Sequence, residues 1–180
     1  MTNLVTDKPN PWWVTGLVDG EGCFYAGLSF RDKKSSSGDL VSCVNLVTEL
    51  SIGLRADDRP VLDRIHDHFG CGEIRWKRSA NGCESTKRAG IVNARPQVTF
   101  KIRKLTDLVG VVIPHFEAFP LQSKKFRDFE IWKEIVRFAH AELSGSKGWL
   151  RRYPEKVDVL DRMCVALKEE RAYRQPTGLN

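Results

Sequence analysis

The chain has 180 residues, 41% hydrophobic and 29% charged, a balance typical of one soluble domain with a real core. No apolar run is long enough to span a membrane, and the first residues lack the basic-then-apolar order of a signal peptide, so we expect an intracellular protein (cytoplasm, nucleoid or organelle matrix) that is not secreted. The five cysteines are scattered and form no Cys-x-x-Cys pair, which argues against a zinc site or a disulfide framework.

The net charge of +6 is distributed unevenly along the chain. Residues 71–104 hold 9 Lys and Arg against 2 Asp and Glu, a local charge of +7. A basic block of this kind favours a polyanionic partner, most often a nucleic acid, although a solvated loop can also be basic.

The first predicted helix begins at Asn10 as N-cap, with Pro11 at the first helical position. Gly16 and Gly20 are four residues apart, so they lie on one face of this helix and would let a second helix approach closely. The helix is short and apolar nearly all round, which predicts that it is buried at an interface.

The end of this helix brings together groups that suit a metal ion. Gly20-Glu21-Gly22 is expected to stop the helix, which places the carboxylates of Asp19 and Glu21 at or just past its C-terminus. The last carbonyl oxygens of a helix are unpaired there, and the dipole favours a cation. An acid beside such carbonyls suits a hard divalent cation such as magnesium.

Two strands and a helix are predicted next. Residues 24–31 alternate, with Phe24 and Phe30 among the inward positions, and residues 31–39 form a polar loop. A second strand covers 44–55. Asp57 or Asp58 can cap the following helix, which has Pro60 in its first turn and ends at Gly70.

Two more strands follow. The third covers 73–78, with Ile74 and Trp76 inward, and the fourth covers 97–103 after a long loop at 79–95. The outward positions of both strands are strongly basic, and an antiparallel sheet commonly buries one face while it presents the other.

The rest of the chain is predicted to be helical. Thr106 can cap a short helix that stops before Pro114, and Ser123 can cap a longer one with Phe126 and Trp132 on its apolar side. After a breaker at 144–148, Tyr153-Pro154-Glu155 begins a last amphipathic helix. We therefore expect an α+β fold of order αββαββα with a four-stranded antiparallel sheet and extra C-terminal helices, divided into an arm (1–10), a main domain (11–140) and a helical extension (141–180).

The segment Val14-Thr15-Gly16-Leu17-Val18-Asp19-Gly20-Glu21-Gly22 resembles the signature of the LAGLIDADG homing endonucleases, and the predicted element order is the one that this family uses. The segment occurs once, so the chain resembles the single-motif members, which act as homodimers. This resemblance implies a site-specific, divalent-metal-dependent double-strand DNA endonuclease, encoded in an intron, that cleaves a long pseudo-palindromic site. Mg²⁺ or Mn²⁺ would be the cofactor, with no small-molecule cofactor and no membrane partner.

The resemblance also implies roles for individual residues. Glu21 and the carbonyl of Gly20 would bind the metal, with Glu where Asp is commoner, while Gly16, Asp19 and Gly22 would build the motif. Lys124, or its neighbour Lys125, stands where the family places a lysine near the scissile phosphate. Arg55 and Arg59 are candidates for the polar position that orients water. His66 and His68 are two apart on a helix, which predicts surface residues.

Base reading would fall to outward strand positions, since Arg pairs with guanine and Asn or Gln with adenine in the major groove. The candidates are Tyr25, Ser29, Arg31, Asn45, Glu49, Arg55, Arg75, Lys77, Arg78, Gln97, Lys101 and Arg103. The alternative function is a non-catalytic nucleic-acid binder of the same fold, either an intron maturase or a transcriptional regulator. An unrelated basic α+β domain ranks below both.

Overall fold

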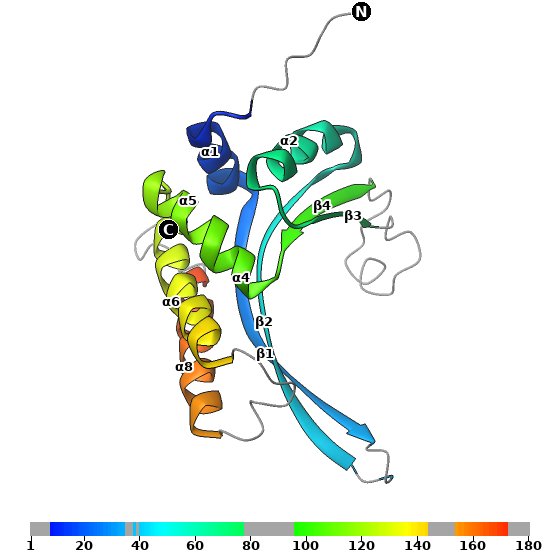
Figure 1. Cartoon of the computed structure of the whole chain (residues 1–180), viewed down its shortest axis with the longest axis vertical. Helices are drawn as coiled ribbons and strands as arrows, with labels where there is room; N and C mark the ends of the chain where they lie inside the picture. Colours follow the sequence, from blue (N-terminus) through cyan, green and yellow to red (C-terminus); the bar gives the residue numbers. More distant parts are fainter. Residues whose placement is uncertain (1–7, 35–37, 39, 78–95, 144–153, 173–180) are drawn as a thin grey trace, which may run out of the picture. The chain divides into compact units, whose positions relative to one another are not determined.

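The computed structural model describes residues 8–34, 38, 40–77, 96–143 and 154–172 (Figure 1). Its elements are α1 (Pro11–Glu21), β1 (Gly22–Lys34), β2 (Leu40–Arg55), the 3₁₀ turn η1 (Ala56–Asp58), α2 (Arg59–Phe69), β3 (Glu73–Lys77), β4 (Gln97–Ile102), α4 (Leu105–Asp107), the π-helical η2 (Leu108–Val112), α5 (Ile113–Ala118), α6 (Lys125–Leu143) and α8 (Pro154–Arg171). The four strands form one sheet in the order β1-β2-β4-β3. The predicted α+β class and four-stranded sheet are confirmed. The loop at 79–95 and the breaker at 144–148 lie outside the described residues.

The chain forms two compact units. Unit 1 comprises residues 1–23 and 49–122, and unit 2 comprises residues 24–48 and 123–180. Each is described by itself below. The predicted division at residues 10 and 140 stays a prediction.

The core of unit 1 lies between one face of its strands and α2. β4 pairs antiparallel with both β2 and β3, so that Ile52, Phe100 and Ile74 form one row across the sheet. Ile52 and Phe100 are fully buried, as are Leu62 and Ile65 of α2. α2 ends at Gly70, whose φ of 64° is the left-handed conformation that glycine adopts without strain, as the sequence predicts.

The first helix also begins as predicted. Asn10 caps α1, since its Oδ1 accepts a hydrogen bond of 2.8 Å from the backbone N–H of Trp12, and Pro11 occupies the first helical position. Val14 and Val18 are fully buried. Trp12, by contrast, is 51% exposed, so the predicted burial of this helix is only partial in the single chain.

A polar chain of three side chains, two buried and one half-buried, ties α1 to α5 and α2. The Thr15 hydroxyl donates to the carbonyl of Phe119 at 2.9 Å, and it lies 3.3 Å from Nε2 of His115. A hydroxyl has one proton to donate, so Thr15 accepts from Nε2–H of His115, whose Nδ1 must then be an acceptor. His68 Nε2, at 3.2 Å, completes the chain as donor to that Nδ1. His68 is thus half-buried and bonded to His115, where the sequence predicts a surface residue.

Two other predictions are wrong because a strand and a helical run are longer than the sequence pattern predicts. β1 continues through residues 31–34, which were predicted as loop, and Phe30 on it is 66% exposed. The helical run from 105 to 118 passes through Pro114 instead of stopping before it, and Thr106 does not cap it. Pro114 is the second residue of α5, directly after the π-helical segment, and it cannot donate a helical hydrogen bond there.

Trp76 has the predicted direction but not the predicted burial. It faces Val98 across the β3–β4 pair, so it shares the core face of the sheet. Because β3 is an edge strand, the ring is 57% exposed and lies against the Arg59 guanidinium, 5.7 Å from the ring centroid.

Unit 2 packs β1 against α6, and α6 against α8 (Figure 1). Phe24 lies 5.3 Å from Phe129 and 5.1 Å from Trp132, centroid to centroid, and Trp132 donates its Nε1–H to the carbonyl of Tyr25. Ser123 precedes α6 and accepts from the backbone N–H of Lys125 at 3.1 Å, which supports its predicted capping role. Phe126, predicted on the apolar side, is 42% exposed. Within the described residues, no helix combines the length and apolar character needed to cross a membrane.

The buried histidine chain makes the stability of unit 1 dependent on pH. Burial, helped by the neighbouring His68 ring, lowers the pKa of His115 from 6.5 to about 4. Between pH 6.5 and about pH 4, His115 is protonated in the unfolded chain but not in the folded chain. The free energy of unfolding therefore has its full value above pH 6.5 and falls as the pH drops toward 4. We expect His115 to contribute a loss of about 3 kcal/mol over this range. Urea unfolding measured from pH 7.5 to 4.5 checks it. The free energy of unfolding should change less with pH in His115→Gln than in wild type. An equal pH dependence in the two proteins would show that His115 is not its source.

Candidate active site and nucleic-acid interface

The turn that carries Glu21 is shaped by close backbone contact. Glu21 is the last residue of α1, and the N–H of Gly22 caps the helix by donating to the carbonyl of Val18. A Cβ at position 22 would lie 2.6 Å from Cγ1 and 2.7 Å from the carbonyl oxygen of Val18. Gly22 has a φ of −79°, so this position needs glycine for space and not for a left-handed backbone.

Asp19 holds the same turn from the other side. Its Oδ2 accepts a hydrogen bond of 2.7 Å from the backbone N–H of Gln122, in the segment that follows α5. A carboxylate that accepts from backbone N–H is a strong, charge-assisted partner. This geometry supports the bracing role expected for Asp19 and leaves Glu21 as the acid that faces outward.

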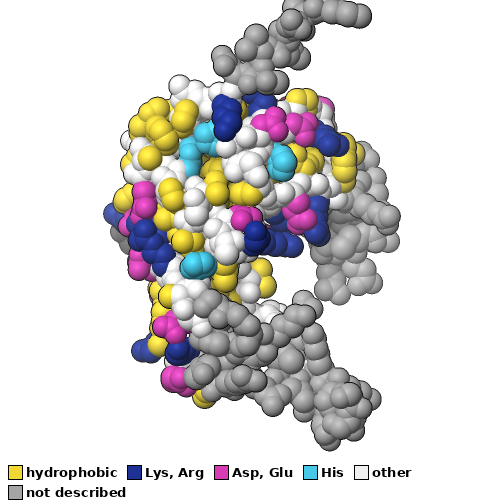
Figure 2. Space-filling view, viewed as in Figure 1, with side chains coloured by type: hydrophobic (Ala, Val, Ile, Leu, Met, Phe, Trp, Pro, Cys, Tyr) yellow, Lys and Arg dark blue, Asp and Glu magenta, His cyan; other side chains and the backbone are white. Residues whose placement is uncertain are grey.

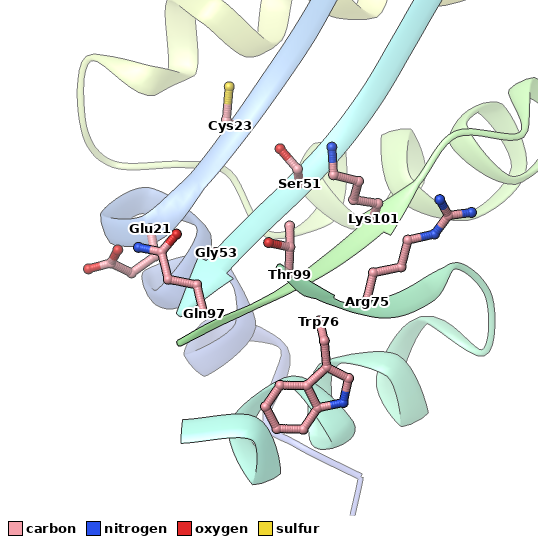
Figure 3. A pocket seen from close by; sticks show the side chains of 9 residues that line it. All are labelled: Glu21, Cys23, Ser51, Gly53, Arg75, Trp76, Gln97, Thr99 and Lys101. Atoms are coloured by element: carbon pink, nitrogen blue, oxygen red, sulfur yellow. The ribbon is translucent and has the colours of Figure 1, made fainter. Parts of the chain in front are cut away.

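Glu21 borders a hollow of about 440 Å³ on the polar face of the unit 1 sheet (Figure 3). The Glu21 side chain is exposed, and the residues that share the hollow with it are Cys23, Ser51, Gly53, Arg75, Trp76, Gln97, Thr99 and Lys101. Figure 3 shows Glu21 and Gln97 at one end of the hollow and Lys101 at the other. The strand register explains the members on the outward face, since Gly53, Thr99 and Arg75 form one row and Ser51 pairs with Lys101 in the next. Trp76 has the opposite parity and borders the hollow from the edge strand β3.

Glu49, predicted to read bases, is 8% exposed. Its Oε1 accepts from Nζ of Lys101 and its Oε2 from Nε of Arg103, each at 2.7 Å. Burial alone would raise the pKa of Glu49, but the hydrogen bonds and charges of its two partners outweigh burial and hold that pKa below its ordinary value. Glu49 is therefore an ionised anion beneath two of the predicted DNA-binding cations.

Other cations predicted at this interface also have acidic neighbours. Arg55 pairs with Asp57, Arg75 pairs with Glu73 at 2.7 Å, and the Arg59 Nε lies 3.6 Å from an Asp63 oxygen. Figure 2 shows Lys and Arg side chains interleaved with Asp and Glu over the described surface it presents. The predicted basic face is thus a face of mixed charge, at least in the part of the chain that the structure describes.

The remaining candidates lie in unit 2 or outside the described side chains. Tyr25 is 43% exposed, Asn45 is exposed and Ser29 is half-buried on their strands. Lys124 is exposed just before α6. Three candidates are not described as side chains: Arg31 and Lys77 lie within β1 and β3, and Arg78 lies outside the described residues.

The donor set at the motif fits magnesium better than a transition metal. In the described residues, no group of three or more His, Cys, Asp or Glu side chains could hold a metal ion. Magnesium keeps several waters and binds proteins through one or two carboxylates, whereas zinc requires three or four protein ligands. One exposed Glu21 at the C-terminal end of a helix therefore fits a hydrated hard cation that takes further ligands from elsewhere.

Sequence reasoning missed the partners of these residues. His115 carries no periodic or motif signal, and the Asp19–Gln122 bond joins residues 103 positions apart. Glu49 occupies a position that alternation predicts to face outward. Its burial follows from Lys101 and Arg103 on a neighbouring part of the chain, which the local sequence around Glu49 does not indicate.

Comparison with known proteins identifies the family to which this motif and fold belong. The family model described as LAGLIDADG endonuclease matches residues 14–136, and the chain belongs to this family. It is 31% identical over 127 residues to an uncharacterized 50.9 kDa protein in ND4 intron 1 of Podospora anserina, and 28% identical over 150 residues to a probable intron-encoded endonuclease 2 of Neurospora crassa.

The coverage of these relatives is partial. The two alignments cover 71% and 81% of this chain. They cover only 24% and 29% of the two fungal proteins. Among solved structures, the homing endonuclease I-TnaI matches with a TM-score of 0.57 at 28% identity, covering 92% of this chain and 100% of that one. The meganuclease I-SmaMI, solved bound to uncleaveable DNA, matches with a TM-score of 0.63 at 20% identity over 92% of this chain and 46% of its own, which shows the shared fold.

The hydrogen bond from Gln122 to Asp19 predicts different costs for the two acids of the motif. Asp19→Ala removes a charge-assisted bond to a backbone N–H and should lower the free energy of unfolding by about 1–2 kcal/mol. Glu21→Ala is the matched control, and because Glu21 is exposed its effect should stay within about 0.5 kcal/mol. Denaturant unfolding of both variants measures the difference. Equal losses would contradict the bracing role of Asp19.

Proposed function

We propose that the chain is a site-specific, metal-dependent double-strand DNA endonuclease of the homing type. The observation that carries this proposal is the placement of Glu21, an exposed carboxylate at the end of the motif helix that opens onto a polar hollow of the sheet. A protein that only binds DNA gains nothing from an anion at this point, because it repels phosphates and is disfavoured by the helix dipole.

The residues around the hollow suit metal-assisted hydrolysis. Glu21 and the carbonyl of Gly20 would hold Mg²⁺ or Mn²⁺, and the bound metal would polarise the scissile phosphate and activate water. Gln97 lines the same hollow and would orient water or phosphate oxygens by hydrogen bonds. Lys124 is not among the residues of the hollow; its proposed role, to stabilise charge on the phosphate, rests on the family resemblance alone. Arg59 is a weaker candidate, since its guanidinium already neighbours Asp63 and the Trp76 ring.

One chain supplies one such acid, whereas cleavage of both DNA strands requires two. A second copy of this chain, docked through α1, would supply the other. Trp12, Gly16 and Gly20 recur at helical spacing and are exposed, and a Cβ built at either glycine meets no atom within 4 Å beyond the neighbouring residues and backbone of its own helix. A two-fold assembly would bind a pseudo-palindromic duplex with half-sites about one helical turn apart. We place the reaction inside the cell, on double-stranded DNA, and the coding frame within an intron, as the names of the fungal relatives suggest.

Glu21→Gln separates an enzyme from a binder. The substitution keeps the size of the side chain and removes its charge, so cleavage should fall by several orders of magnitude because each site loses a metal ligand. DNA affinity should hold or rise, since an anion beside the phosphates is gone. The substrate is a duplex selected from a randomised pool by binding in calcium, and the readout is nicking and linearisation in magnesium.

Asp19→Asn is the control, since it should act through folding or dimerisation and not through the cleavage step. Full cleavage by Glu21→Gln would remove this residue from the mechanism. A wild-type chain that binds the selected duplex but never cuts it would favour the maturase or regulator function instead.

Gly16→Leu tests the second copy. A leucine at position 16 fits the single chain but blocks close approach of a partner helix, so the dimer should dissociate at least tenfold more readily. Gly110→Leu is the matched control, because Gly110 is also an exposed helical glycine with open space at its Cβ position. Sedimentation velocity over a concentration series measures the change. A wild-type monomer that still cuts both strands would contradict the dimer.

A further inference from the structure

Glu49, Lys101 and Arg103 form a cluster in which one carboxylate uses both oxygens. Oε1 accepts from Lys101 and Oε2 from Arg103, both at 2.7 Å. The Glu49 side chain is 10% exposed, while its partners are 24% and 47% exposed. The acid is therefore the most deeply buried member of the cluster.

This burial makes the cluster different from the other ion pairs on the same face. A buried carboxylate loses hydration, and only well-placed partners compensate for that loss. Lys101 and Arg103 are consequently fixed in one arrangement with respect to Glu49. Arg75 and Glu73, by contrast, are 64% and 40% exposed, and exposed pairs of this kind hold their geometry weakly.

The cluster also limits the charge that this part of the sheet presents. Two cations over one anion leave a net charge of +1, and a face that attracts phosphates less strongly binds arbitrary DNA less tightly. The pairing to Arg103 uses Nε–H, so the four hydrogens on its terminal nitrogens are not required for it. Both oxygens of Glu49, by contrast, already accept a hydrogen bond from a cation.

We propose that Glu49 is a positioning residue for DNA selectivity: it fixes Lys101 and Arg103 for contact with base edges and reduces the sequence-independent attraction of this face for DNA. The inference rests on the proposed function insofar as it takes DNA as the ligand. It does not depend on cleavage.

Glu49→Gln tests the proposal, with Glu73→Gln as the matched control on the exposed pair of the same face. Fluorescence anisotropy measures binding to two probes in calcium, a mixed-sequence 30-bp duplex and a duplex selected from a randomised pool, between 50 and 200 mM salt. For Glu49→Gln, affinity for mixed-sequence DNA should rise about three- to tenfold, and the slope of log K against log salt should steepen by about one, the change for one more neutralised phosphate. The preference for the selected duplex should fall about tenfold. Glu73→Gln should stay within about twofold of wild type on both probes.

Two results would overturn the proposal. If Glu49→Gln weakens binding to the selected duplex alone, with mixed-sequence binding and salt slope unchanged, Glu49 reads a base. If both probes weaken equally, or neither changes, Glu49 has a purely structural role or none in binding.

Glu49→Asp keeps the test decisive if the Gln variant fails to fold. It retains the charge but shortens the side chain, so the salt slope should remain that of wild type while preference for the selected duplex falls. Unchanged preference in this variant would also overturn the positioning role. A wild-type chain that binds DNA with these properties but does not cleave would refute the nuclease proposal and leave this one standing.

Discussion

The C-terminal turn of α1 is the constraint on which the candidate site depends. Glu21 stands exposed at the edge of the hollow, and the residues on either side of it are held in place. Asp19 is bonded to the backbone of Gln122, and Gly22 passes so close to Val18 that no side chain would fit. One turn earlier, Thr15 is bonded to Phe119 and His115. The motif is thus held at Thr15, Asp19 and Gly22. Glu21 is the acid of the motif that takes no part in these contacts.

Electrostatic balance is the second feature of the site. A basic sequence segment suggests a uniformly positive surface, yet the described cations of the unit 1 sheet have carboxylates within ion-pair distance. Such pairing weakens the electrostatic attraction of these cations to phosphates. It also defines their side-chain geometry, because a paired cation samples fewer conformations. Recognition of bases needs that geometry more than it needs affinity.

Periodicity predicted the elements well where burial is one-sided. β4 alternates as expected, with Val98, Phe100 and Ile102 fully buried. Periodicity did not predict burial where the sheet is uncovered. Phe30 and Trp76 follow the inward pattern but are exposed, since each lies toward the end of a strand. Trp76 also lies on the edge strand of the sheet. Alternation specifies which face a side chain shares, and only the neighbouring elements decide whether that face is covered.

The sequence by itself determined the order of the elements, the helix boundaries at Asn10 and Gly70, and the motif with its single outward acid, because capping, glycine and alternation act over a few residues. Tertiary structure alone decided the partners. Glu49 meets Lys101 across 52 positions and Thr15 meets His115 across 100. Contacts at such separations depend on strand register and helix packing, which no local pattern encodes. Folding therefore placed Glu49 beneath its cations and kept His115 neutral in the core.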